Sequence, residues 1–128
     1  MRYTLLVTGS AYGTQNSSSA LLFARTLLKL EHKLESIFFY RDGVLNGNRF
    51  IFPATDEVDI VRGWQQLYEE NGVILNICIA AALRRGVINS QEALHLNFND
   101  SNLQFGFKLT GLRTLAKAIL NCDRLVQF

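Results

Sequence analysis

The residue with the clearest potential for chemistry is Cys78, because of where it lies in the chain. It ends the run Val73-Ile74-Leu75-Asn76-Ile77-Cys78 and precedes Ile79-Ala80-Ala81-Ala82-Leu83-Arg84-Arg85-Gly86. The first stretch has the β-branched residues of a buried strand, and the second has strong helix formers closed by a glycine. The sequence therefore predicts a strand that delivers Cys78 to the start of a short helix.

A cysteine at that position could act as a nucleophile. The thiolate is the reactive form of cysteine, and the positive end of a helix dipole favours it. The alternative is that Cys78 is a small buried side chain with a packing role only, which is common for free cysteines. The spacing alone leaves both interpretations open.

Three other residues are weaker candidates. Arg84 and Arg85 lie six and seven residues after Cys78, about 9 Å along a helix axis, which is close to the ~8–10 Å screening length of salt solutions. We expect them to bind a partner rather than to act on the thiol. Cys122, at the end of the last predicted helix, is expected to be a packed structural thiol. No Cys-x-x-Cys motif is present, which argues against a dithiol mechanism.

The loop Gly9-Ser10-Ala11-Tyr12-Gly13-Thr14-Gln15 is a second place where a ligand could bind. It connects a predicted strand to a helix N-terminus, where anions bind, and it is weakly similar to the phosphate loop of flavodoxins. It matches neither a Walker A loop nor the motif GxGxxG, so a plain strand–helix connection is the simpler interpretation. His32 and His95 are expected at the surface. No metal-ligand spacing is present, and no metal or cofactor is expected.

Composition and charge exclude several classes of protein. The 128 residues are 48% hydrophobic and 19% charged, which is typical of one globular domain spanning residues 1–128. A net charge of +2 is small for a chain that binds nucleic acid directly. The N-terminus lacks the apolar segment of a signal peptide, and the longest apolar run, Ile77 to Leu83, is far short of the ~20 residues that cross a membrane. We expect a soluble cytoplasmic protein with reduced cysteines.

Strands and helices alternate along the chain. Apolar runs predict the strands, and apolar stripes at helical spacing after a capping residue predict the helices. This alternation predicts an α/β fold, namely a single three-layer α/β/α domain with a mainly parallel sheet. The predicted strands are Tyr3–Gly9, Glu35–Tyr40, a short one at Arg49–Phe52, Val73–Cys78 and Arg124–Phe128. The predicted helix caps are one of Ser17, Ser18 and Ser19, then Asp56, Ser90 and Thr110, and the last helix has the stripe Leu112, Leu115, Ala116, Ile119 and Leu120.

The edge of the sheet where parallel strands end is the usual place for ligands and chemistry. Cys78 is predicted to lie at that edge, and so is the loop Ser10–Ser18. The two could therefore face one another.

The same residues also resemble a known family. The blocks that carry the resemblance are spread over the whole chain. They are Thr8-Gly9, Ala11-Tyr12-Gly13-Thr14, Phe38-Phe39-Tyr40-Arg41 with Gly43-Val44, Asn76-Ile77-Cys78, Ala80 to Gly86, Ser101-Asn102-Leu103-Gln104, Cys122-Asp123-Arg124 and Val126-Gln127-Phe128. Together they resemble the DsrE-like family of bacterial sulfur-relay proteins.

This resemblance implies a parallel sheet between helices and a sulfurtransferase activity. It implies that Cys78 accepts sulfane sulfur as a persulfide from TusA and passes it to TusE. From there the sulfur reaches MnmA, which thiolates the wobble uridine of tRNA. It also implies assembly with two smaller homologous subunits, TusB and TusC, as a dimer of heterotrimers, without direct contact with nucleic acid or membrane.

Three functional hypotheses follow. The first is a sulfur carrier that uses Cys78. The second is a flavin- or nucleotide-binding, flavodoxin-like module that uses Ser10 to Thr14. The third is a non-catalytic subunit that serves assembly only. The residue pattern alone leaves all three open, and the family resemblance favours the first.

Overall fold

Five parallel strands form one sheet, in the order β4-β3-β2-β1-β5. The computed structural model describes residues 1–128. The strands are β1 (Arg2–Val7), β2 (Lys33–Phe39), β3 (Ile74–Cys78), β4 (Phe107–Thr110) and β5 (Arg124–Gln127). The helices are α1 (Asn16–Lys29), α2 (Ile60–Asn71), α3 (Ile79–Arg84), α4 (Ser90–His95) and α5 (Leu112–Asn121), with a 3₁₀ helix η1 (Arg41–Gly47) after β2.

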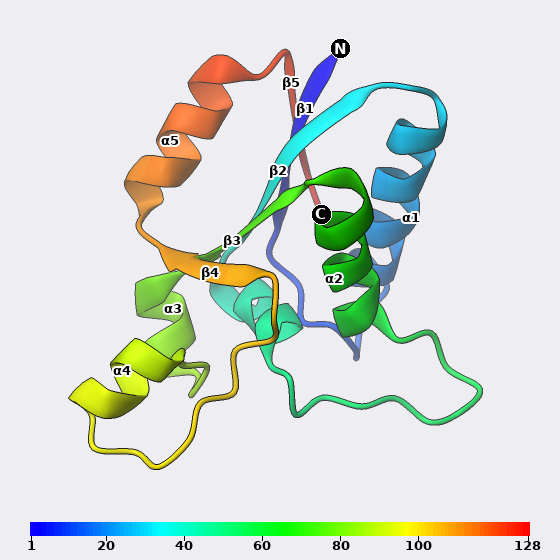
Figure 1. The fold of residues 1–128 in the computed structure, drawn as a ribbon. Coiled ribbons are helices and arrows are strands. Elements are labelled where there is room, and N and C mark those ends of the chain that lie inside the picture. Colours follow the sequence, from blue (N-terminus) through cyan, green and yellow to red (C-terminus); the bar gives the residue numbers. More distant parts are fainter.

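Helices lie on both faces of this sheet. Figure 1 shows α1 and α2 on one face and α5 on the other, while α3 and α4 lie beyond the ends of β3 and β4. This arrangement confirms the predicted three-layer α/β/α fold with a parallel sheet. No helix is both long enough and apolar enough to span the hydrocarbon of a membrane.

The main core lies between the sheet and the layer of α1 and α2. Trp64 of α2 is fully buried and packs edge-on against Phe39 of β2, with 5.3 Å between the ring centroids. Phe39 also contacts Phe107 of β4, with 5.4 Å between their centroids. This aromatic cluster identifies the face of the sheet that packs on α2, and it fixes which way each neighbouring strand residue points, because side chains alternate along a strand.

The segment between β2 and α2 differs from the prediction. The strand expected at Arg49–Phe52 does not form, and the chain instead makes η1 followed by an irregular segment. η1 lies so close to β1 that a Cβ on Gly43 would come within 2.0 Å of the carbonyl oxygen of Val7. Tertiary packing, which no local pattern reveals, therefore determines this conformation.

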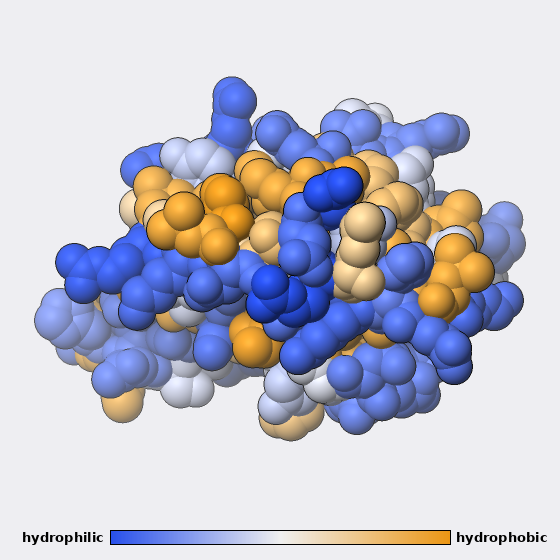
Figure 2. Space-filling view, turned by 90° about the horizontal axis from the view of Figure 1, so that it is seen from above, coloured by the Kyte–Doolittle hydropathy of each residue, from blue (hydrophilic) through white to orange (hydrophobic).

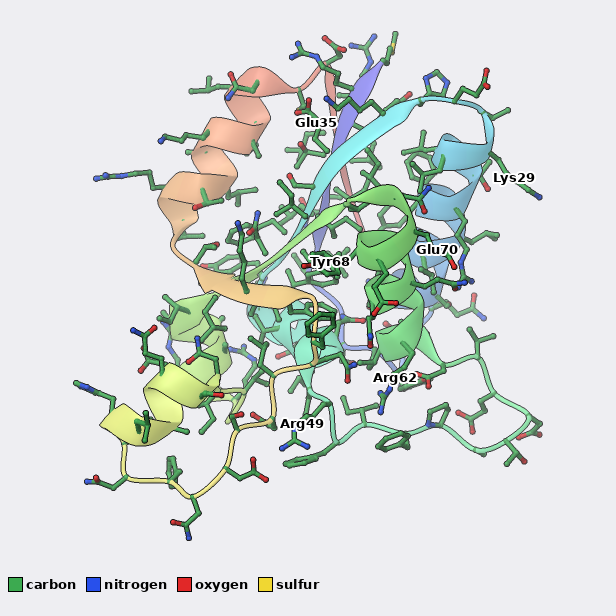
Figure 3. All side chains as sticks on the ribbon, in the orientation of Figure 1. Lys29, Glu35, Arg49, Arg62, Tyr68 and Glu70 are labelled. Atoms are coloured by element: carbon green, nitrogen blue, oxygen red, sulfur yellow. The ribbon has the colours of Figure 1, made fainter.

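A side chain of α2 holds the irregular segment after η1 in place. Arg62 donates hydrogen bonds to the carbonyl oxygens of Arg49 (3.1 Å) and Ile51 (2.6 Å). Figure 3 shows Arg62 extending from α2 toward this segment. These bonds use the carbonyls that a strand would have paired with a neighbour, so the segment stays off the sheet.

The starts of the helices were predicted least accurately. Asp59 caps α2 by accepting a hydrogen bond from the backbone N–H of Arg62 (3.2 Å). Ser17 lies inside α1 and donates to the carbonyl oxygen of Gly9 (2.8 Å) instead of capping the helix. The observed N-caps are Gln15, Asp59, Asn89 and Gly111, in place of the predicted Ser17–Ser19, Asp56, Ser90 and Thr110.

Strand β4 was not predicted. It has only four residues, and its last residue, Thr110, was assigned to the start of the following helix. β4 pairs with β3 in parallel, from Leu75 with Phe107 to Cys78 with Thr110. The pairing places Thr110 beside the candidate cysteine.

Helix α5 is less buried than its apolar stripe suggested. None of its residues is fully buried, although Leu115 packs against the core. Leu112, Ile119 and Leu120 are 49%, 40% and 83% exposed. Figure 2, which looks down on the molecule, shows apolar side chains in a band across this face that includes the left side, where α5 lies in Figure 1. The stripe therefore serves the core only in part, and its outer residues form an exposed apolar surface.

Candidate functional site

Cys78 lies where the sequence predicted, at the junction of β3 and α3. It is the last residue of the strand and the residue before the first turn of the helix, with an extended backbone (φ −62°, ψ 118°). Gly86, with a φ of +75°, ends the helical segment in the left-handed conformation that glycine adopts without strain. The side chain of Cys78 is 3% exposed, so the thiol is almost fully buried in the isolated chain.

The strand register shows which face of the sheet Cys78 occupies. Ile77 is paired with Phe39, which packs on α2. Cys78 follows Ile77, so its side chain lies on the opposite face, the one that carries α5. Asn76 shares that face because it precedes Cys78 by two residues, and Thr110 shares it as the partner of Cys78 on β4.

Polar side chains next to Cys78 lack hydrogen-bond partners. Asn76 is 3% exposed, and its Oδ1 accepts no hydrogen bond. The hydroxyl of Thr110 is also buried without a partner. A third such group, the hydroxyl of Thr4 on β1, lies on the same face but two strands away from β3. Buried polar groups without partners are rare in native proteins, and this face holds three of them.

Sequence reasoning identified Cys78 but not Asn76 or Thr110. The alternation of side chains along β3 would have placed Asn76 on the face of Cys78. Thr110 carried no such signal, because its position depends on the unpredicted strand β4.

The two arginines after α3 have different environments. Arg85 donates to the carboxylate of Asp42 (2.9 Å) and to the carbonyl oxygen of Ala81 (3.1 Å). It therefore fastens α3 to η1 within the chain. Arg84 is exposed and has no such intramolecular ion pair. Of the two, Arg84 is the one that is free to meet a partner, and that role stays a prediction.

The loop after β1 is fastened to α2. The hydroxyl of Tyr12 donates to the carbonyl oxygen of Val58 (2.6 Å) and accepts from the backbone N–H of Ile60 (3.1 Å). Ser10 donates to the carbonyl oxygen of Tyr12 (2.6 Å). None of these bonds reaches β3 or α3, so no hydrogen bond joins this loop to Cys78.

A buried asparagine occupies the end of the sheet beneath the same loop. The amide of Asn46 donates to the carbonyl oxygen of Gly9 (3.0 Å) and to the hydroxyl of Ser17 (3.1 Å). Its Oδ1 accepts from the indole N–H of Trp64 (2.9 Å). The hydroxyls of Ser10 and Ser17, which a phosphate could have bonded, are thus engaged with the protein, and this favours the plain strand–helix connection.

The remaining candidates lie apart from Cys78. Cys122 is partly exposed after α5, with its Sγ 3.5 Å from the carbonyl oxygen of Ile119, and its structural role stays a prediction. His32 lies 3.3 Å from the N-terminal amine and against the ring of Tyr3, and His95 is exposed at the end of α4. No group of three or more His, Cys, Asp or Glu side chains is placed to hold a metal ion.

Two carboxyl groups have a pKa below the ordinary range. The backbone N–H of Ser101 lowers the pKa of Asp100, with help from the guanidinium of Arg49. The backbone N–H and the side chain of Arg2 lower the pKa of Asp123. Both carboxylates are exposed and hydrogen-bonded outside β3 and α3. They stabilise chain segments and are not placed to act as a base for the candidate thiol.

Comparison with known proteins adds independent information. The model of the DsrE/DsrF-like family matches residues 1–128. The chain is 61% identical to Sulfurtransferase TusD of Cronobacter sakazakii, 60% to that of Erwinia tasmaniensis and 59% to that of an Enterobacter species, over 100% of both chains in each case. The crystal structure of the ychN protein from E. coli superposes with a TM-score of 0.81 at 22% identity, covering 100% of this chain and 99% of that one, and it supports the fold.

These matches confirm the resemblance found in the sequence. The family match spans every block that carried the resemblance, and the three relatives share one name and one activity. The chain belongs to the DsrE/DsrF-like family, and within that family it is a sulfurtransferase.

Proposed function

We propose that Cys78 carries sulfur as a cysteine persulfide. The observation that carries this proposal is the position of the thiol within a chain of the sulfurtransferase family. Cys78 ends β3, an inner strand of the sheet, at the edge where α/β proteins place their active sites. The other thiol, Cys122, precedes β5 and so lies at the opposite edge. A single thiol of this kind is sufficient for persulfide relay, which needs neither a metal nor a dithiol pair.

The proposed chemistry consists of two exchange steps. In the first, the thiolate of Cys78 attacks the outer sulfur of a donor persulfide. A new S–S bond forms on Sγ, the donor S–S bond breaks, and its electron pair leaves with the donor as a thiolate. In the second, an acceptor thiolate attacks the outer sulfur, and Cys78 leaves as a thiolate. Each step replaces one S–S bond with another, so no external oxidant or reductant is consumed.

The burial of Cys78 suits a carrier of labile sulfur. At 3% exposure, the thiol is shielded from small thiols in solution. Transfer then requires a local opening that brings the outer sulfur to a partner. A docked partner protein can stabilise that open state, whereas a diffusing small molecule binds too weakly to do so.

The test is intact mass measurement and peptide mapping after incubation with a persulfide donor. We expect one added sulfur atom on Cys78, removable by a reductant and absent in Cys78→Ser. Cys122→Ser is the matched control and should load as the unmodified chain does. An adduct on Cys122 alone, or no adduct when the proposed partner proteins are present, would reject the proposal.

We further propose that TusA donates this sulfur, that TusE accepts it, and that it serves MnmA in 2-thiolation of the tRNA wobble uridine, in the cytoplasm. The identity of 59–61% with proteins named Sulfurtransferase TusD supports this assignment. Because the net charge is only +2, tRNA is expected to be reached through partners rather than by this chain. Sulfur added to Cys78 from loaded TusA, and then found on TusE, would be the supporting result.

The homologous subunits TusB and TusC are the proposed assembly partners, in a dimer of heterotrimers. The outer residues of α5 support such an assembly, since Leu120 is 83% exposed and continues an apolar stripe with Leu112 and Ile119. We expect Leu120→Lys to weaken the complex on size-exclusion chromatography. Leu30→Lys, at a residue that is 64% exposed after α1, is the matched control and should leave assembly intact.

A further inference from the structure

We propose that Asn76 and Thr110 hold the outer sulfur of the persulfide on Cys78. This inference rests on the proposed function of Cys78 and adds two residues that contact the reacting atom. Its basis is that the amide oxygen of Asn76 and the hydroxyl of Thr110, both buried without partners, flank the one thiol that is placed to carry sulfur.

The sheet fixes the geometry of this trio. Cys78 and Thr110 are register partners on β3 and β4, so their Cα atoms are about 4.8 Å apart and their side chains point to the same face. Asn76 lies two residues earlier on β3, roughly 7 Å along the strand. No hydrogen bond joins Thr110 Oγ1 to the sulfur of the unloaded cysteine. An S–S bond of about 2.05 Å carries the outer sulfur beyond Sγ, on the face of the sheet where both side chains lie.

The chemistry of the two side chains fits a persulfide. A persulfide ionises more readily than its parent thiol, so its outer sulfur carries negative charge that needs donors when it is buried. The hydroxyl of Thr110 and the side-chain amide of Asn76 are neutral donors. Both can donate a hydrogen bond to the anionic sulfur. Because neither is charged, no unpaired charge is left buried when the sulfur is absent.

Loading would also remove an energetic cost. In the unloaded chain, the hydroxyl of Thr110 is buried without a partner, which is unfavourable. When the donor S–S bond breaks and the new bond forms on Cys78 Sγ, the transferred sulfur supplies an acceptor for the hydroxyl of Thr110 and for the side-chain N–H of Asn76. The donor leaves as a thiolate, and the proton of the persulfide goes to solvent. The site therefore favours the loaded state over the unloaded one.

Thr110→Val tests this inference, because valine has the shape of threonine but no hydroxyl. The measurement is the equilibrium constant for sulfur exchange between Cys78 and glutathione persulfide, obtained by intact mass at defined ratios of glutathione persulfide to glutathione. Because burial of Cys78 slows this exchange without changing its equilibrium, each mixture is followed until the loaded fraction is constant. We expect this constant to fall about tenfold, the effect of losing one charge-assisted hydrogen bond. Thr110→Ser restores a hydroxyl and should recover most of the loss, and Asn76→Leu should lower the constant in the same way.

Thr4→Val is the matched control. It removes a buried hydroxyl that also lacks a partner and lies on the same face, but on β1, away from Cys78. It should leave the exchange constant unchanged. The unloaded Thr110→Val and Thr4→Val proteins should both melt no lower than the unmodified chain, because neither hydroxyl bonds to another residue.

The outcomes separate this inference from the proposed function. If the unmodified chain takes no sulfur on Cys78, both are wrong. If it loads and Thr110→Val, Thr110→Ser and Thr4→Val share one exchange constant, the inference alone is overturned and the two side chains have a packing role. If Asn76→Leu does not fold, the Thr110 variants still decide the matter.

Discussion

Replacing Gly47 with alanine would test how the end of β3 is held in place. Gly47 is the last residue of η1, and a Cβ built on it would lie 2.1 Å from Cδ1 of Ile77, the residue before Cys78. Leu103 and Phe107 would be next, at 3.3 and 3.4 Å. The contact at 2.1 Å is too short for any real Cβ, so the terminal methyl group of Ile77 must move within the packed core.

The size of the effect follows from two opposing terms. Overpacking a well-packed core costs about 1–3 kcal/mol. The loss of glycine from the unfolded chain offsets roughly 0.4–1 kcal/mol of this cost. We therefore expect Gly47→Ala to lower the free energy of unfolding by about 1–2 kcal/mol, which for a chain of this length corresponds to a fall in Tm of roughly 3–10 °C.

A double-mutant cycle in urea isolates the contact. Ile77→Val deletes Cδ1, the atom in conflict, and alone costs roughly 0.5–1.5 kcal/mol. In the double variant the added methyl group can occupy the space that the deleted one leaves. The combined loss should therefore be smaller than the sum of the two single losses by about 1–2 kcal/mol. Additive losses would refute the argument, because they would mean that Ile77 is not what Gly47 makes room for.

The same variant should also affect sulfur loading. Ile77 is fully buried, so we expect part of this displacement to pass to the backbone of Cys78, and loading by a persulfide donor to slow beyond what the loss of stability explains. Gly72→Ala is the matched control. Gly72 ends α2 with a φ of +69° in open space, so alanine there costs about 1–2 kcal/mol through backbone strain, away from the site. Equal loading by the two variants would contradict the expected displacement.

Three further predictions follow from the structure. Asn46→Ala should lower the free energy of unfolding by roughly 2–4 kcal/mol in urea titrations, because it removes a buried side chain and leaves the indole N–H of Trp64 without its acceptor; an unchanged midpoint would contradict this. In the isolated chain, peptide mapping should show that a maleimide labels Cys122, which is partly exposed, well before Cys78, which is 3% exposed. The hydrogen bond from the backbone N–H of Arg2 depresses the pKa of Asp123, so its stabilisation is present above about pH 4 and is lost as the pH falls through the folded-state pKa; Asp123→Asn should make the acid loss of Tm slightly shallower.

The parts of the fold that were predicted correctly have strong local signals. β3 is an apolar run bounded by Gly72, and α2 has a stripe that includes Trp64 and ends at that glycine. Such patterns depend on which side chains must leave water, and this is a property of each segment alone. The alternation of these segments was enough to predict the α/β architecture.

The parts that were missed depend on contacts distant in the sequence. β4 is a short edge strand whose identity comes from pairing with β3. η1 is shaped by the approach of Gly43 to Val7 and by the hydrogen bonds of Asn46. The helix caps were missed because several Ser, Asp and Asn residues near each helix start are equally good caps in isolation. Packing selects among them.

The candidate site divides in the same way. The position of Cys78 could be predicted because consecutive residues show the change from strand to helix. Its polar neighbours could not, because Thr110 reaches Cys78 only through the register of β3 with β4. A site composed of residues from two strands becomes visible only when the pairing of those strands is known.

The packing of α5 bears on how a buried thiol can exchange sulfur. α1 and α2 each have five buried residues, whereas α5 has none. Elements with little buried surface open at the lowest free energy, so the face under α5 is easier to uncover than the face under α1 and α2. Cys78 and Asn76 lie on that face, and Thr110 joins β4 to α5 through Gly111. We therefore expect sulfur to reach Cys78 through displacement of α5, the helix that carries the exposed apolar stripe with Leu120. A partner that covers this stripe would act directly on the access of sulfur to Cys78.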